Sequence, residues 1–326
     1  MADHGGGDFT LLALCVESSH ARGMGHLYRA LNLAQALAAR NISLLFVIND
    51  HKPAHGLIAE HGHRFELAPL EDTASGWEEG IVARHGIRLW INDRLNTGRR
   101  HGECIKAMGL ALVTFDDRGE GAAFADLNVA ALVFDEAASL PGKRVLQGVD
   151  YLILNPEIAQ YQRLRSRRDS LLVTLGGSDT YGVTVKVVRM LAGLGLGATV
   201  VVGPGFAHHN DLAEVMTPTF ILKQGVPSLI AEFFHHDLAI TGGGITPFEA
   251  NASGLPCIVI ANEYFEVAVG KVLSRLGGAV FAGHHSELQS EVFSMPLPIE
   301  AMSRAGMNHV GLEGMHRVVE AITEYL

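Results

Sequence analysis

Short, continuous apolar segments alternate with segments of helical periodicity along most of this chain. In the first half the apolar segments cover residues 9–16, 43–48, 89–91, 111–115 and 130–134. Residues 26–39 follow the first of these and carry apolar side chains at the spacing of one helical face: Leu27, Leu31, Ala34 and Leu37. Apolar strands separated by helices are typical of a parallel sheet buried on both faces. We therefore predict a doubly wound α/β domain.

The same alternation starts again after a polar, charged segment at residues 160–169. Apolar strand segments recur at 171–175, 198–202, 237–240 and 256–260, and helical segments at 184–191, 227–234, 267–276 and 314–326. The expected architecture is two Rossmann-like domains, residues 1–158 and 159–326, with a cleft between them. The connecting segment contains four arginines that we expect to lie on a solvated surface: Arg163, Arg165, Arg167 and Arg168.

The strongest motif is a glycine-rich segment at residues 241–250, between a predicted strand and a predicted helix with Pro247 in its first turn. Such a turn presents unpaired backbone N–H groups and the positive end of a helix dipole, which together favour a phosphate. Its candidate ligand-binding residues are Gly243, Gly244, Ile245 and Thr246. Glu249, one turn into the helix, could accept hydrogen bonds from a ribose, so the pattern suggests a nucleoside diphosphate. The plainer alternative is an ordinary turn with an exposed glutamate.

A second glycine-rich turn follows the first predicted strand. Gly23 and Gly25 allow close approach of the backbone to a ligand, and His26 at the helix start is a candidate general base. Arg29 could balance charge on a bound ligand. A dinucleotide fingerprint would need glycine in place of Tyr28, so a nicotinamide cofactor is disfavoured. Alternatively, His26 only caps the helix.

Further candidates lie where predicted strands end. Gly176, Gly177 and Ser178 form a corresponding turn in the second half, and they could contact the diphosphate or the sugar, although many strand-to-helix turns look the same. Three carboxylates follow predicted strands of the first half: Asp93, Asp116 and Asp117. Ligands bind at this edge of parallel sheets, so these carboxylates could orient a histidine or bind sugar hydroxyls. Turn and capping roles explain them equally well.

Composition excludes several classes of protein. A formal charge of −10 over 326 residues argues against nucleic-acid binding. Cys15, Cys104 and Cys257 lie far apart without a CxxC pattern, which favours a reducing, cytoplasmic setting. No apolar stretch approaches the roughly 18 residues of a membrane span. The adjacent histidine pairs lack metal-ligand spacing, so we expect no metal and no cofactor.

Together these motifs resemble the glycosyltransferase-B superfamily. They are similar to the UDP-2,4-diacetamido-2,4,6-trideoxy-β-L-altropyranose hydrolases of pseudaminic acid biosynthesis and to their spore-coat-polysaccharide relatives. The matching segments occur in the family's order: residues 23–29, 115–117, 176–179, 242–250 and Asn262-Glu263 with the helix that follows. The resemblance implies that His26 is the catalytic base and that the C-terminal half binds UDP, with Glu249 on the ribose. The chain departs from the family at Ala30, where cysteine is frequent, and at Glu263, where glutamine is frequent.

The resulting prediction is an enzyme that releases UDP from a UDP-sugar. His26 would take a proton from the water that attacks the anomeric carbon, and Asp93 would assist it. One alternative is a glycosyltransferase that uses an acceptor hydroxyl in place of water. Another is a non-catalytic protein that binds a nucleotide sugar. The sequence leaves the oligomeric state open.

Overall fold

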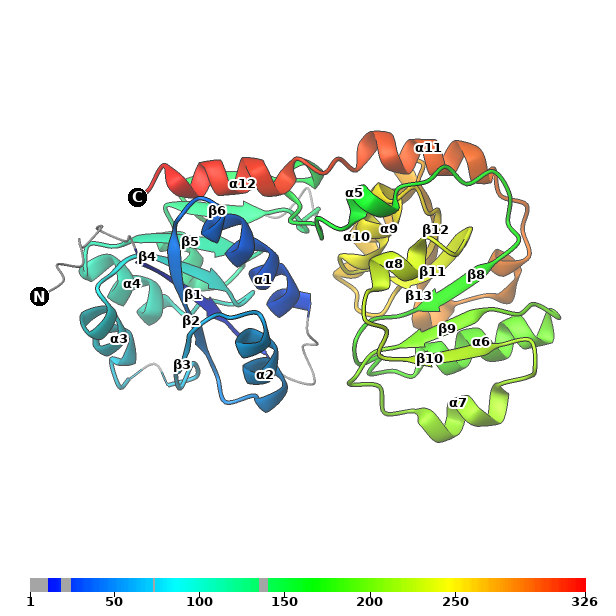
Figure 1. The fold of residues 1–326 in the computed structure, drawn as a ribbon, viewed down its shortest axis with the longest axis horizontal. Helices are drawn as coiled ribbons and strands as arrows, with labels where there is room; N and C mark the ends of the chain where they lie inside the picture. Colours follow the sequence, from blue (N-terminus) through cyan, green and yellow to red (C-terminus); the bar gives the residue numbers. More distant parts are fainter. Residues whose placement is uncertain (1–10, 19–24, 73, 135–139) are drawn as a thin grey trace, which may run out of the picture. The chain divides into compact units, whose positions relative to one another are not determined.

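The computed structural model describes residues 11–18, 25–72, 74–134 and 140–326, which form two compact α/β units (Figure 1). One unit contains the first strand, His26–Ile153 and Glu313–Leu326, and the other contains Leu154–Leu312. Each unit is built on one parallel sheet, as the sequence predicts. Among the described residues, no helix is long and apolar enough to span a membrane.

The first unit has a seven-stranded sheet in the order β3-β2-β1-β4-β5-β6-β7. Its strands are β1 (Leu11–Val16), β2 (Ser43–Ile48), β3 (Phe65–Leu67), β4 (Ile87–Asp93), β5 (Ala111–Phe115), β6 (Leu127–Ala130) and β7 (Arg144–Gln147). Its helices are α1 (Gly25–Ala38), α2 (Lys52–Glu60), α3 (Trp77–His85), α4 (Arg99–Ala107) and α12 (Gly314–Thr323), with short 3₁₀ turns η1 (Glu120–Phe124) and η2 (Val149–Tyr151). The central strand β1 is buried on both faces, which explains its continuous apolar sequence.

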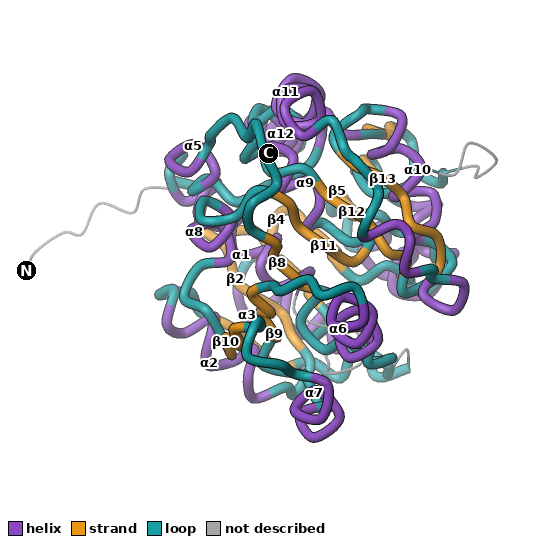
Figure 2. The backbone as a smooth tube through the Cα atoms, turned by 90° about the vertical axis from the view of Figure 1, so that its right-hand side faces the viewer, coloured by secondary structure: helices purple, strands orange, loops and turns teal. Residues whose placement is uncertain are grey.

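The second unit has a six-stranded sheet in the order β10-β9-β8-β11-β12-β13, and several of its strands run side by side in Figure 2. Its strands are β8 (Leu171–Thr174), β9 (Thr199–Val202), β10 (Ile221–Gln224), β11 (Leu238–Gly242), β12 (Cys257–Ala261) and β13 (Ala279–His284). Its helices are α5 (Ile158–Tyr161), α6 (Val183–Gly193), α7 (His209–Val215), α8 (Leu229–Phe233), α9 (Thr246–Ala252), α10 (Glu266–Arg275) and α11 (Ile299–His309), with 3₁₀ turns η3 (His285–Glu287) and η4 (Ser290–Phe293). Alternate apolar residues of β8, β9, β11 and β12 pack against α6 and form a hydrophobic core on one face of this sheet.

In both sheets the strand order changes direction at one central pair of strands. In the first unit β1 lies beside β4, because the chain builds β2 and β3 on one side and β5 to β7 on the other. In the second unit the corresponding pair is β8 and β11. The loops that leave such a pair diverge at the carboxyl ends of the strands, where ligands of open α/β sheets bind. Asp93 is the last residue of β4, and His26 and both glycine-rich turns of the second unit follow the other three of these strands.

Two sequence-based assignments differ from the structure in position. The sequence predicts a strand at 130–134, but the strand in this region is β6, Leu127–Ala130. Buried apolar residues continue after β6, so the apolar pattern extends beyond the strand. The predicted domain ranges, 1–158 and 159–326, differ from the compact units at the connection and at the last helix. That helix, α12, contacts η2, where Arg317 Nη1 lies 3.1 Å from Asp150 Oδ1. After the helix ends, the Tyr325 hydroxyl donates to the Asp126 carbonyl at 3.2 Å. Helical periodicity does not specify which core a helix covers.

The connecting segment contains a buried arginine, so the expectation of four solvated arginines is wrong for Arg165. Its side chain is 0% exposed and donates to the carbonyls of Phe233 at 2.7 Å and His236 at 3.2 Å, and also to that of Ser253. Phe233 ends α8 and Ser253 follows α9, so the guanidinium lies at the negative ends of two helices. Burial nevertheless lowers the pKa of Arg165 to about 9. Only Arg167, at 78% exposure, is as solvated as expected.

Candidate active site

His26 and Asp93 form a close pair at the carboxyl edge of the first sheet. His26 lies in the first turn of α1, Asp93 is the last residue of β4, and His26 Nδ1 lies 2.5 Å from Asp93 Oδ1. The Asp93 side chain is 2% exposed, whereas that of His26 is 19% exposed. A carboxylate at Nδ1 favours the tautomer with a proton on that nitrogen. Nε2, which has no hydrogen-bond partner in the described part of the chain, is then the basic nitrogen.

Arg29 lies one helical turn after His26 and holds Asp93 from a second direction. Its Nε donates to Asp93 Oδ2 at 2.8 Å and its Nη2 to Asp93 Oδ1 at 2.5 Å. Burial by itself raises the pKa of Asp93, but the charges of Arg29 and His26 outweigh it and hold that pKa well below its usual range. Asp93 is therefore ionised at neutral pH, as a partner of a histidine base must be.

Asp116 completes this buried network from the next strand. It follows β5, and its Oδ2 accepts a hydrogen bond from Arg29 Nη1 while its Oδ1 accepts one from the Leu132 N–H at 2.8 Å. Its φ of 49° is in the left-handed region, which aspartate tolerates better than most residues. The two carboxylates together raise the pKa of Arg29 against the effect of burial. His26, Arg29, Asp93 and Asp116 therefore form one connected set, which we call the histidine network.

The structure separates residues that the sequence grouped together. Asp117 accepts from the N–H groups of Thr97 at 2.9 Å and Gly119 at 2.8 Å, so it orders a loop.

Arg29 is 8% exposed and its donors contact carboxylates, which makes it a support for Asp93 and not the ligand contact expected from the sequence. The available signal was its spacing of three residues from His26, which puts both on one helix face.

Of the two glycines predicted in this loop, Gly23 lies outside the described residues. Gly25 begins α1 and is exposed, and a Cβ added there would meet no atom within 4 Å. Packing within the protein therefore does not require glycine at this position, which leaves close approach of a ligand as its predicted purpose.

In the second unit, the glycine-rich turn after β11 has the predicted arrangement of strand, turn and helix. Pro247 lies in the first turn of α9, and Gly244 is exposed while Ile245 and Thr246 are half-buried. The Gly243 N–H already has a partner, since it donates to Glu266 Oε2 at 3.4 Å. Sequence reasoning missed Glu266, because a glutamate at the start of a helix has the pattern of a solvated residue.

The turn after β8 has a different construction. Gly176 has a φ of 100°, and the Gly177 carbonyl accepts from the Gly205 N–H at 3.0 Å. Asp179 accepts from the N–H groups of Val183 at 2.8 Å and Thr184 at 2.7 Å, so the start of α6 is capped by the protein itself. Of the predicted residues here, Ser178 is half-buried beside this cap and its Oγ lies 3.4 Å from that of Thr180.

Two further predicted residues lie on the same edge of the second sheet. Glu249, half-buried in the first turn of α9, accepts from the Asn155 N–H at 3.3 Å, and burial raises its pKa to about 7. The side-chain Oδ1 of Asn262 is buried and has no hydrogen-bond partner among the described residues, while its backbone N–H donates to Glu266 Oε2 at 2.7 Å. Both side chains keep hydrogen-bonding capacity for a ligand.

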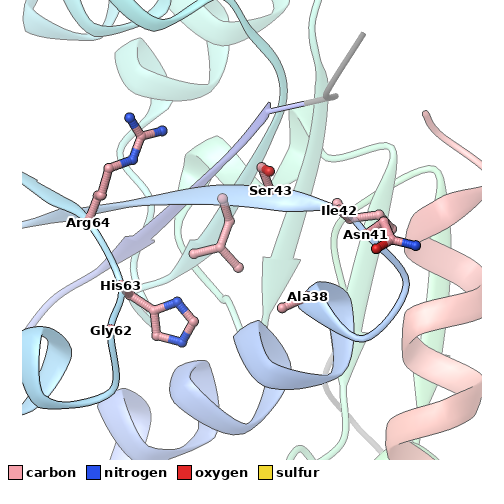
Figure 3. A pocket seen from close by; sticks show the side chains of 8 residues that line it. Ala38, Asn41, Ile42, Ser43, Gly62, His63 and Arg64 are labelled. Carbon is pink, nitrogen blue, oxygen red and sulfur yellow. The ribbon is translucent and has the colours of Figure 1, made fainter. Parts of the chain in front are cut away.

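A pocket in the first unit lies away from the histidine network (Figure 3). It is lined by the end of α1, the start of β2 and residues 62–64, and Figure 3 shows the side chains of Asn41, His63 and Arg64 around it. It is thus at the amino end of β2, whereas His26 lies at the carboxyl edge of the sheet. Within the described ranges, no three His, Cys, Asp or Glu side chains are grouped so that they could hold a metal ion.

No protein-family model matches the chain. An uncharacterized protein of Methanocaldococcus jannaschii is 25% identical over 273 residues, which cover 76% of this chain and 55% of that protein. The spore coat polysaccharide biosynthesis protein SpsG of Bacillus subtilis is 24% identical over 286 residues, which cover 83% of each protein.

Solved structures are similar over almost the whole chain. MurG of Acinetobacter baumannii has a TM-score of 0.70 at 12% identity, over 97% of this chain and 99% of that one. The UDP-GlcNAc 2-epimerase of Neisseria meningitidis, solved with bound UDP-GlcNAc, has a TM-score of 0.64 at 11% identity, over 96% of this chain and 100% of that one. The chain therefore has the fold of the glycosyltransferase-B type, with two Rossmann-like domains, as the sequence motifs imply.

Proposed function

We propose that this protein is an enzyme that cleaves the bond between a sugar and UDP, with water as the acceptor. The observation that carries the proposal is the histidine network. A buried, ionised Asp93 fixes Nδ1 of His26 at 2.5 Å, and the other ring nitrogen has no partner in the described residues. A partly exposed histidine base with a fixed tautomer is the arrangement that proton abstraction from water requires.

The chemical step is a substitution at the anomeric carbon. His26 Nε2 takes a proton from water while the water oxygen bonds to the anomeric carbon, and the bond from that carbon to the diphosphate oxygen breaks. UDP leaves with the electron pair of that bond. Asp93 stabilises the imidazolium that forms, and Arg29 with Asp116 keeps Asp93 in place.

The second unit supplies the nucleotide-binding residues in this proposal. Backbone N–H groups of the turns after β8 and β11 would bind the diphosphate and stabilise the charge that develops as it leaves. The contacting residues would be Gly176, Gly177, Ser178, Gly243, Gly244, Ile245 and Thr246, with Glu249 on the ribose and Asn262 on the nucleotide or sugar. The UDP-GlcNAc bound to the structurally similar epimerase supports the choice of ligand class.

The substrate is proposed to be a UDP-linked amino or deoxy sugar of surface-glycan or nonulosonic acid biosynthesis. Sequence similarity to SpsG and the resemblance to pseudaminic acid hydrolases support this class. A glycosyltransferase with the same site is the alternative, and the fold shared with MurG is compatible with it.

The test is a screen of UDP-, CMP-, GDP- and dTDP-sugars without an acceptor, with thermal shift and nucleotide release followed together. We expect stabilisation by the UDP ligands and release of UDP, with His26→Ala reducing the rate at least about 100-fold. UDP release only after an acceptor is added would establish transfer. Binding without turnover in either condition would show a non-catalytic protein, and the absence of any binding would refute the proposal.

A further inference from the structure

Three backbone N–H groups from two loops converge on one carboxylate oxygen of the second unit. Glu266 Oε2 accepts from the N–H groups of Asn262 at 2.7 Å and of Glu263 and Gly243 at 3.4 Å each. Gly243 follows β11 and Asn262 follows β12, which pair side by side in the sheet. Convergent backbone N–H groups at the end of parallel strands form a cradle for an oxyanion, and here the protein's own carboxylate occupies it.

The fit of Glu266 in this cradle depends on the glycine-rich turn. A Cβ added at Gly243 would lie 2.6 Å from the Glu266 Cβ, so only glycine admits this side chain. Burial raises the pKa of Glu266, although the three N–H groups oppose that effect. The neighbouring carboxylate, that of Glu263, has a different hydrogen-bond partner: its Oε1 accepts from the Tyr181 hydroxyl at 2.7 Å.

We infer that Glu266 is an internal competitor for the anion site: in the free protein its carboxylate occupies the N–H groups that a ligand oxyanion takes. This inference rests on the proposed function, which places a diphosphate at Gly243. A phosphate oxygen and the Glu266 carboxylate cannot share the same donors, and their like charges repel. Glu266 must therefore release the Gly243 N–H when the diphosphate binds.

The competitor has a consequence for turnover. Once the sugar–diphosphate bond has broken, the return of Glu266 to the cradle opposes retention of UDP. The residue weakens binding of ligands that have a phosphate at this position and leaves unchanged the binding of ligands without one.

The test is calorimetric titration of wild type, Glu266→Gln and Glu263→Gln with UDP and with uridine. Removing the competing charge is expected to tighten UDP binding by about tenfold in Glu266→Gln, with uridine binding unchanged. Glu263→Gln removes an equal charge outside the cradle and should alter UDP binding by less than about threefold. Glu266→Ala, which also removes the charge, should tighten UDP binding in the same direction, and melting temperatures report whether each variant is folded.

Equal or weaker UDP binding by folded Glu266→Gln overturns the inference while leaving the proposed function intact. Equal tightening by Glu263→Gln also overturns it, because the effect would then be general electrostatics. If neither wild type nor Glu266→Gln binds UDP, the proposed function and the inference fail together.

Discussion

The guanidinium of Arg29 contacts both carboxylate oxygens of Asp93, with Nε 2.8 Å from Oδ2 and Nη2 2.5 Å from Oδ1. Oδ1 also receives His26 Nδ1 at 2.5 Å. One buried carboxylate is thus shared between a permanent cation and a titratable ring. The arginine keeps Asp93 ionised whether His26 is neutral or protonated, so the carboxylate can stabilise the imidazolium without taking its proton.

Replacing Asp93 by asparagine should lower the rate of UDP release about 100- to 10,000-fold, because the amide no longer fixes the tautomer of His26. The measurement is the initial rate at saturating substrate, with UDP affinity measured in parallel. UDP affinity should stay within about threefold, since Asp93 contacts His26 and not the proposed nucleotide site. A variant that retains the wild-type rate would contradict the assigned role of Asp93.

Arg29→Met should destabilise the first unit by about 3–5 kcal/mol, because it leaves two buried carboxylates without their cation. Urea unfolding of the variant and of Arg29→Met combined with Asp116→Asn measures this effect. The double variant removes one of the stranded charges and should recover part of the loss. Strictly additive effects would argue against the coupling of Arg29 to Asp116.

Glu249 should make stability depend on pH. Its folded-state pKa of about 7 lies above the unfolded value of about 4.3, so the folded protein binds more protons between these values. The contribution of Glu249 therefore favours folding below about pH 4.3 and is lost as pH rises through about 7.

Glu249→Gln removes this titration and keeps an acceptor for the Asn155 N–H. The melting temperature of the variant minus that of wild type should increase between pH 4.5 and pH 8. If the melting temperatures of the two proteins differ by the same amount at every pH, Glu249 does not titrate in this range.

Arg165→Met should lower the free energy of unfolding by about 2–4 kcal/mol, because the carbonyls at the ends of α8 and α9 lose their buried donor. Arg167→Met is the matched control, since that side chain is 78% exposed and should change stability by less than about 0.5 kcal/mol. Chemical unfolding of both variants provides the comparison. Equal effects would mean that Arg165 is no more important than a surface arginine.

The alternation of apolar strands and helices was sufficient to predict two parallel sheets and their inner strands, because strands buried on two faces have few polar residues. It did not indicate the edge strands β3, β7, β10 and β13, most of whose residues are not fully buried. The carboxylates at strand ends were likewise predictable, and Asp93 lies beside His26 as the edge position suggested. What sequence could not distinguish was a charged residue with buried partners from one in solvent. Arg29, Arg165 and Glu266 all have sequence surroundings typical of surface positions, and each has partners that are distant in sequence.

The helix α12 contacts η2 of the first unit although it follows all of the second. From His26 onward the polypeptide passes from one unit to the other near residues 153 and 312. A fragment ending at residue 158 would lack α12, whose Val318 and Ile322 are fully buried, while Leu154–Leu312 is a continuous segment that contains all six strands of its sheet. The second unit is thus the one to express as a single continuous piece of chain, and studying the histidine network in isolation would require joining the separated stretches of the first unit.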